Sequence, residues 1–404
     1  MKSLYLTATL GLLALCTAAQ ATDWDFDIDA RLLTSDGDKS FLDGGLGSLR
    51  FGENRSGLQL GRARLALTQP LGELTSLHLD ASAWGDHEKN PIDLTEAYLE
   101  YRPYPLAGYR ARIKAGAFYP PISLENRAAG WESPYTLSSS AINTWLAEEM
   151  RTIGIEGQLE WLGTRTGHNF DVGLTAAVFG WNDPLGGVVV SHGFSLHDRQ
   201  TGLFGRVGPP GVEPLLGRQP FHEIDGRAGM YAGIEARYLD RVVLRVLHYD
   251  NRANPAAYNE ELDDYAWETK FDSAGLRFES AAGWTAIAQW LNGTTYIAPG
   301  GFELEWPFDA RFALLSKRIG PHTLSARYDD FNVDSENTSL KGKQSGHALT
   351  AAYVFEHGPH WRLTLEWLHV TSRDWNRTIY LAEPTFAVES KVELAVRYAL
   401  HGNH

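Results

Sequence analysis

The stretch that decides the fold is YRARIKAGAF, residues 109–118. Successive side chains of a strand point to opposite faces, so this stretch has one apolar face and one basic face, the latter formed by Arg110, Arg112 and Lys114. Residues 151–162, RTIGIEGQLEWL, alternate in the same way. In a soluble sandwich the apolar face lies inside, whereas in a membrane barrel it faces lipid and the polar face lines the lumen. The rest of the chain decides between these two.

The first 21 residues have the pattern of a secretory signal: Lys2, an apolar run over residues 4–15, and an Ala-Gln-Ala cleavage motif at 19–21. The run is too short for a membrane helix. Cys16 follows Leu15 instead of a small residue, which favours an ordinary signal over lipidation. Without this signal the chain has no cysteine, which excludes disulfides and thiolate metal sites.

Composition narrows the class of protein. The chain has 36 basic and 50 acidic residues and a net charge of −14, which argues against nucleic acid as a partner. No stretch after residue 21 approaches the 18 apolar residues of a membrane helix. Glycine and aromatic residues are plentiful, which suits a chain whose apolar residues are spread over many alternating strands.

Alternation predicts about 16 strands. We expect them near 23–32, 57–68, 74–84, 92–102, 109–118, 151–162, 168–181, 227–238, 241–250, 267–280, 283–293, 303–317, 321–331, 346–356, 360–371 and 389–400. Leu58 and Leu60 are out of phase with Leu65 and Leu67, which predicts a bulge at Gly61. Residues 303–317 are the least regular, because Pro307 lies inside them.

The connections alternate between long and short. Those after odd strands are 34–56, 85–91, 119–150, 182–226, 251–266, 294–302, 332–345 and 372–388. Those after even strands are 69–73, 103–108, 163–167, 239–240, 281–282, 318–320 and 357–359, and each is shorter than every odd one. Short periplasmic turns and long extracellular loops are typical of transmembrane barrels. The sequence therefore predicts an all-β, antiparallel transmembrane barrel in the bacterial outer membrane, with a secreted soluble β-protein as the alternative.

Aromatic residues near the predicted strand ends indicate interfacial girdles. Those near short turns are Tyr101, Tyr109, Trp161 and Tyr238, and those near long loops are Trp84, Trp181 and Tyr249.

A barrel of this size keeps an aqueous channel, so the expected function is passive diffusion of small solutes. Arg110, Arg112 and Lys114 form a basic column whose members are about 7 Å apart. Arg62 and Arg64 form a second column. Fixed cations in a row would guide anions. The equal alternative is that they offset acids in the lumen: Asp25, Asp27, Asp29, Glu156 and Glu160.

Residues 119–150 are too long and too apolar for a surface loop. Residues 138–140, three serines, offer a helix N-cap, and apolar residues follow at helical spacing: Ile142, Trp145, Leu146 and Met150. We expect the loop to fold into the barrel, to narrow the pore, and to bring four charges near the basic column: Glu125, Arg127, Glu148 and Glu149. The alternative is that it caps the rim or contacts a neighbouring subunit.

Three segments resemble the phosphate-selective porin O and P family: residues 57–67 with RARL, TEAYLEY at 95–101, and KAGAFYPPISLE at 114–125. The resemblance covers residues 57 to about 160. It implies a 16-stranded outer-membrane barrel, a homotrimer, loops folded inward, and arginines that guide anions such as phosphate. Two features depart from the family. The chain ends in YALHGNH without a terminal aromatic residue, and its acidic balance weakens the transfer of phosphate selectivity.

Enzymatic motifs are absent from the sequence: it has no Gly-x-Ser-x-Gly, no His-Glu-x-x-His and no phosphate loop. We therefore predict no enzyme and no cofactor, with an outer-membrane enzyme or adhesin, or a channel for an uncharged or organic solute, as alternatives. Residues 36–40 begin like a calcium loop, but Phe41 replaces its glycine. The acidic run 260–264 is a solvated cluster or a weak divalent-ion site near lipopolysaccharide. The expected partners are outer-membrane lipid, lipopolysaccharide, small solutes and further copies of the chain.

Overall fold

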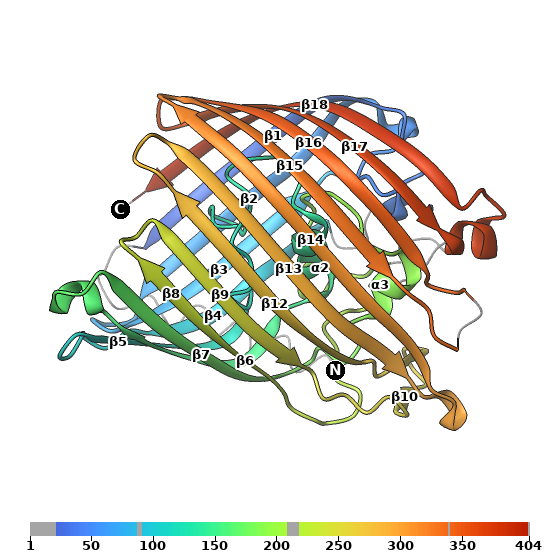
Figure 1. Ribbon diagram of the computed structural model, residues 1–404, viewed down its shortest axis with the longest axis horizontal. Helices are drawn as coiled ribbons and strands as arrows, with labels where there is room; N and C mark the ends of the chain where they lie inside the picture. Colours follow the sequence, from blue (N-terminus) through green and yellow to red (C-terminus); the bar gives the residue numbers. More distant parts are fainter. Residues whose placement is uncertain (1–21, 87–90, 208–217, 338–339, 403–404) are drawn as a thin grey trace.

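The chain forms one closed antiparallel barrel of 16 strands, in which every strand pairs with its sequence neighbours and β1 pairs with β18 (Figure 1). The computed structural model describes residues 22–86, 91–207, 218–337 and 340–402. The predicted signal sequence, with Cys16, lies outside the described residues, as does part of the predicted loop 182–226. The predicted fold class is confirmed.

The barrel strands extend as follows: β1 Asp23–Ser35, β2 Gly57–Pro70, β3 Thr75–Trp84, β4 Ile92–Tyr101, β5 Tyr109–Phe118, β6 Thr152–Trp161, β7 Phe170–Gly180, β8 Gly229–Tyr238, β9 Val242–Asp250, β12 Glu268–Glu279, β13 Trp284–Ile297, β14 Leu304–Ile319, β15 His322–Val333, β16 Gln344–His357, β17 Trp361–Asp374 and β18 Phe386–Gly402. A small hairpin, β10 (Tyr258–Asn259) and β11 (Asp264–Tyr265), lies in the loop between β9 and β12. The main helices are α2 (Ala141–Glu149) and α3 (Gly187–His192). Among the described residues, no helix is long and apolar enough to cross a membrane.

Two sequence predictions, one about a bulge in β2 and one about the lengths of the connections, differ in outcome. The bulge at Gly61 is confirmed: the register between β1 and β2 shifts there, where a Cβ atom would lie 1.6 Å from Asp29 Oδ1. The strict rule that every odd connection is longer than every even one is wrong. β13 continues to Ile297, so connection 298–303 is shorter than the turn 162–169. The general asymmetry holds, and we call the two ends of the barrel the long-loop rim and the short-turn rim.

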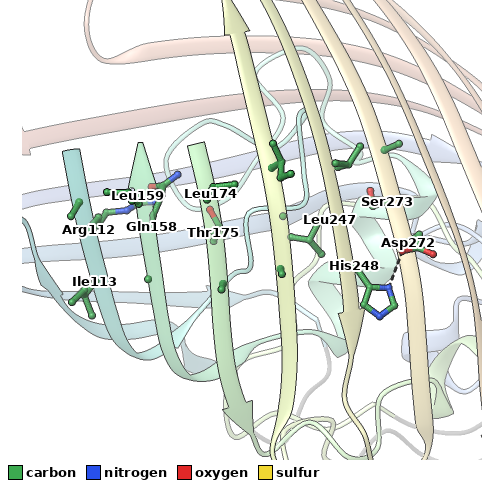
Figure 2. A pocket seen from close by; sticks show the side chains of 18 of the residues that line it. Arg112, Ile113, Gln158, Leu159, Leu174, Thr175, Leu247, His248, Asp272 and Ser273 are labelled. Carbon is green, nitrogen blue, oxygen red and sulfur yellow. Dashed lines mark hydrogen bonds and ion pairs between the residues drawn. The ribbon is translucent and has the colours of Figure 1, made fainter. Parts of the chain in front are cut away.

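The outer face of the barrel is apolar. Ile113, Leu365 and Leu394 lie on it with 45%, 46% and 37% of their surfaces exposed, whereas the adjacent Glu366 faces inward and is 0% exposed. This outer face also carries a depression of about 880 Å³ over β5 to β13, shown in Figure 2, with an exposed pair between His248 and Asp272 at its edge. An apolar outer face on a closed barrel is the arrangement of a membrane-spanning barrel.

Two of the predicted girdle residues do not face lipid. Trp84 and Tyr249 are buried and point inward, because their strands place them on the lumen face. Tyr249 stacks between Phe179 and Phe271, with ring centroids 5.0 and 4.9 Å apart. Tyr101, Tyr109, Tyr238 and Trp181 are exposed, in agreement with a girdle.

The interior of the barrel contains protein. Helix α2 lies inside the barrel, behind the strands β13 and β14 in the view of Figure 1, and every residue of this helix is buried. Ser140 caps its N-terminus by accepting a hydrogen bond from the Asn143 amide at 3.3 Å. Trp145, at the centre of the helix, contacts inward-facing aromatic rings from two strands, Phe271 and Phe308.

We predict that cysteine labelling will distinguish the two faces only where the loop leaves the lumen wall uncovered. In lipid vesicles a water-soluble thiol reagent should modify Arg112→Cys, whose arginine is partly exposed in the lumen, and should leave Ile113→Cys unmodified. Glu366→Cys should also stay unmodified, because this inward residue lies beneath residues 137–138 of the loop. Rapid labelling of Ile113→Cys would contradict the orientation.

Candidate pore lining

The loop 119–150 crosses the lumen and is fastened to the opposite wall by Arg327 of β15. The guanidinium donates to Glu125 at 2.7 Å and to the Ser138 and Ser139 carbonyl oxygens at 2.7 and 2.9 Å. It also donates to Asp329 on its own strand at 2.7 Å. The side chain of Arg327 is 0% exposed. Charged hydrogen bonds in a dry environment are strong, so this residue fixes the position of the loop.

Two wall carboxylates receive the backbone of the same loop. Glu366 of β17 accepts from the Leu137 amide at 2.7 Å and from the Ser138 amide at 3.1 Å. Asp329 accepts from the Ala141 amide, at the start of α2, at 3.1 Å. Acids near a helix N-terminus are favourable because they satisfy amides that have no partner within the helix. The entrance to α2 is therefore built by the barrel wall.

The tip of the loop, residues 128–132, lies against β2 and β18. Glu132 pairs with Arg62 at 2.8 Å and with Arg397 at 2.5 Å. Gly130 has a φ of +70°, and a Cβ atom there would lie 2.6 Å from Arg64 Nε. A left-handed backbone and this close approach both require glycine. The tip consequently closes one side of the lumen.

The predicted column of Arg62 and Arg64 is neutralised by acids. Arg62 contacts Asp27 at 3.1 Å in addition to Glu132, and Arg64 contacts Asp80 at 2.5 Å and Asp27 at 3.3 Å. Both arginines are buried. The alternative reading of the sequence, in which these arginines offset lumen acids, describes this column.

The second column is less uniformly paired. Arg110, near the short-turn rim, forms an ion pair with Glu160. Arg112 has only distant acids, Glu100 at 3.6 Å and Glu156 at 3.9 Å. Lys114 makes no ion pair with the described residues, and its ammonium lies 4.6 Å from the ring centre of Tyr98. Within this column, direct ion pairing is therefore weakest at Arg112 and Lys114.

Of the four charged loop residues expected near the basic column, Arg127 lines the same cavity as Arg112 and Lys114, whereas the other three have partners elsewhere. Glu125 binds Arg327, and Arg127 binds Glu279 of β12 at 2.7 Å. Glu148 and Glu149 point toward the second long loop. Glu148 and Glu149 are carried there because α2 runs along β14 and β15, on the far side of the lumen from β5.

Glu149 joins the two inward-folded loops. Its carboxylate accepts from Trp145 Nε1 at 2.6 Å and from the Val188 and Val189 amides at 2.7 and 3.2 Å, where α3 begins. Burial raises the pKa of Glu149 to about 7, although these donors oppose the shift. Glu148, next to it, contacts His197 at 3.1 Å; burial opposes ionisation there, but the two nearby histidines lower the pKa of Glu148 overall.

Residues 181–207 form a second inward-folded segment, which the sequence analysis did not single out. Its apolar side chains are buried, including Val189 and Phe194. Phe194 contacts Trp145 of α2 and Phe331 of the wall, with ring centroids 6.2 and 5.9 Å apart. In the sequence, the apolar run Val188–Val190 within a long connection is the feature that could have predicted this inward folding. The expectation of an aqueous channel is wrong for the side of the lumen along β12 to β17, where apolar side chains of the wall and of both inward-folded segments fill the interior.

A buried ion-pair network fills the lumen beside β1. Arg31 contacts Asp198 of the second segment at 2.5 Å and Glu393 of β18 at 3.1 Å. Asp198 also contacts Arg50, in the loop between β1 and β2, at 3.1 Å. Burial raises the pKa of Asp198, but the two arginines outweigh it and hold the pKa well below its usual range. A single carboxylate thus links the second inward-folded segment to the loop between β1 and β2 and to β1 itself.

Between these fillings lies a polar cavity of about 510 Å³. It is bounded by β2 to β5 on one side and by residues 119–131 of the loop on the other. Its charged lining residues are Asp25, Arg64, Asp80, Glu96, Arg112, Lys114 and Arg127. This cavity, and not the depression on the lipid-facing side, is the candidate solute site, because the chemistry of a channel lies in its lumen.

One group of acids in the described part of the chain is spaced closely enough to share a metal ion. The acids near enough to share an ion are Asp183, Glu223 and Asp225, at the long-loop rim, and the predicted acidic run 260–264 does not form such a group. Their oxygens accept backbone hydrogen bonds, as in the 2.6 Å contact from the Ile224 amide to Asp183.

Comparison with known proteins supports the fold. No family model matches the chain, and no curated protein matches it in sequence. Among solved structures, the outer membrane channel DcaP of Acinetobacter baumannii has a TM-score of 0.54 at 12% identity, covering 94% of this chain and 96% of its own. A loop-deletion mutant of OmpT, an outer membrane protein of Vibrio cholerae, has a TM-score of 0.53 at 8% identity, covering 94% and 99%.

The anion-selective porin from Comamonas acidovorans has a TM-score of 0.51 at 11% identity, covering 94% of this chain and 99% of its own. At these identities the similarity concerns the fold. The fold is that of outer-membrane barrels, in agreement with the predicted localisation.

We predict that Arg327→Met will free the loop from the wall. The substitution leaves Glu125 and Asp329 buried without their partner, and breaking a buried pair costs about 3 kcal/mol or more. Hydrogen exchange of the amides of residues 137–141 should accelerate roughly 100-fold or more. The control is Arg311→Met, which removes an exposed arginine paired with Asp330 on the outer face. Equal protection in both variants would contradict the role of Arg327.

We predict that the contact between α2 and α3 weakens as the pH rises. The pKa of Glu149 is raised from 4.5 to about 7, so the contact is fully stable below its ordinary pKa and loses stability as the pH rises through about 7. Protection factors of the amides 186–189 should therefore be larger at about pH 5 than at about pH 8. Glu149→Gln should remove this dependence. A dependence that survives the substitution would assign it to neighbouring groups, Glu148, His192, His197 or Asp183.

Proposed function

We propose that the protein is an outer-membrane porin that lets small solutes diffuse through the cavity beside β2 to β5. The observation that carries this proposal is the polar cavity of about 510 Å³ inside the barrel, bounded by the wall and the first inward-folded loop. The loop narrows the lumen to this side, because apolar packing fills the side of β12 to β17. A narrow polar passage in a closed barrel suits selective diffusion, not the wide aqueous channel of an unfilled barrel.

The passage favours anions through Arg112 and Lys114. Most lumen arginines are paired with acids, so they contribute little net potential, as the pairs of Arg62 and Arg64 illustrate. Arg112 and Lys114 lie in the cavity lining with the weakest compensation. An anion that leaves the first meets the second one strand repeat, about 7 Å, further along β5. Phosphate, the solute implied by the family resemblance, is one such anion.

We also propose how copies of the chain assemble and what surrounds them in the membrane. The resemblance to the phosphate-selective porin O and P family implies a homotrimer, and the outer leaflet would supply lipopolysaccharide as a neighbour of the long-loop rim. The residues proposed to guide anions are the basic column of β5: Arg110, Arg112 and Lys114. No enzymatic activity is included.

The charge preference of the passage can be measured in planar bilayers. We predict conductance for the wild-type protein, and a shift of the reversal potential toward cations for Lys114→Glu in a salt gradient at low ionic strength, where screening is weak. The control is Lys317→Glu, which makes the same change of charge outside the lumen, beside Trp284 at the short-turn rim. Absence of conductance would overturn the channel, and equal shifts in both variants would overturn the anion path.

A further inference from the structure

The cavity has an aromatic wall as well as a charged one. Tyr119 and Trp131 stack with ring centroids 4.2 Å apart and an angle of 7° between the planes. The Arg151 guanidinium lies 3.5 Å from the centre of the Tyr119 ring. Both residues line the cavity; Tyr119 is buried, whereas Trp131 is partly exposed.

The position of Trp131 is enforced by its surroundings. It has a φ of +54°, which is unusual for a large side chain, and it follows Gly130 at +70°. Gln200 of the second inward-folded segment donates to the carbonyl oxygens of Gly130 at 2.7 Å and of Trp131 at 3.3 Å. Such a backbone conformation costs free energy and persists only where neighbouring contacts hold it, often at ligand sites. The second inward-folded segment therefore holds the backbone of Trp131 in place.

The opposite wall supplies the positive charge. Lys114 lies over Tyr98, and Tyr98 stacks on His78 with ring centroids 4.8 Å apart. All three line the same cavity as Trp131. The cavity thus combines aromatic surfaces on two sides with an ammonium that makes no direct ion pair among the described residues, although Glu96 lines the same cavity.

The acids of the cavity restrict the charge of the solute. Asp80 is bound to Arg64, and Glu96 accepts a hydrogen bond from the Tyr119 amide at 3.0 Å. Asp25 lies on the same lining. Asp80 is neutralised by Arg64, so Glu96 and Asp25 are the acids that would repel a second negative charge on a solute, whereas one charge can be placed at Lys114. The lining therefore suits a monoanion better than a multiply charged inorganic ion.

We propose that this cavity selects organic monoanions with an aromatic ring, the aromatic monocarboxylates being the class that fits. The carboxylate would pair with Lys114 while the ring packs on Trp131. Aromatic pairs prefer offset or edge-to-face contact and gain more than their buried area alone. This inference rests on the proposed channel, for which it names the solute class.

Equilibrium binding to the purified barrel in detergent tests this inference without relying on transport. The probes are benzoate, cyclohexanecarboxylate, benzamide and inorganic phosphate, measured by isothermal titration calorimetry near neutral pH. Cyclohexanecarboxylate keeps the charge without the flat ring, and benzamide keeps the ring without the charge. Benzoate should bind about tenfold more tightly than either, and more tightly than phosphate. Equal affinity for benzoate and cyclohexanecarboxylate would overturn the aromatic selectivity, and phosphate binding as tight as benzoate would overturn the solute class.

Two pairs of variants locate the binding. Lys114→Gln should weaken benzoate binding about tenfold, whereas the control Lys317→Gln removes an ammonium that also lies over an aromatic ring, Trp284, but outside the lumen. Trp131→Leu should reduce the preference for benzoate over cyclohexanecarboxylate, and Trp131→Phe should retain it. Trp131→Phe also serves if the leucine variant does not fold. Unchanged benzoate affinity in folded Lys114→Gln would overturn the site.

Conductance of the same preparations separates this inference from the proposed function. Benzoate selectivity without conductance would leave the binding site and remove the channel. Conductance without any benzoate preference would leave the channel and remove the inference.

Discussion

The buried contacts of Arg327 hold the loop 119–150 inside the barrel, and the packing of the interior depends on that loop. A guanidinium in this position is tolerable only if its donors are satisfied, and the loop supplies Glu125 and two carbonyl oxygens for that purpose. The loop in turn cannot leave without stranding a charge. The barrel and the loop 119–150 therefore depend on each other. The wall positions α2, and α2 provides the surface on which the second inward-folded segment, residues 181–207, packs.

This dependence divides the lumen into two chemical regions. On the side of β12 to β17, inward-facing aromatic residues such as Phe271 and Phe308 form a dry core with α2. On the side of β1 to β5, ion pairs and a polar cavity remain. The alternation of a strand distinguishes two faces, but an inward face adjoins water in one region and protein in the other. Selectivity of the passage then depends on the few charges that the network does not compensate.

Strand positions, the bulge at Gly61 and the apolar outer face could be predicted from sequence, because each follows from local periodicity. The inward loop could be anticipated from apolar residues such as Trp145 in a segment too long for a turn. Its partners could not. Arg327 and Asp198 act through contacts between segments far apart in the chain, and no local pattern specifies which acid meets which arginine. The acids that pair with Arg62 and Arg64 include Asp27, whose alternation with apolar residues already places it on the lumen face.

The junction between β1 and β18, where the first and last strands meet, is bridged on its inner side by Arg31 with Glu393 and by Arg397 with Asp29. Loop residues Asp198 and Glu132 bind the same arginines. This arrangement constrains biogenesis. The hydrogen bonds that close the barrel lie beside arginines whose charge is satisfied only when both loops are in place, so closure of the wall and filling of the lumen are coupled.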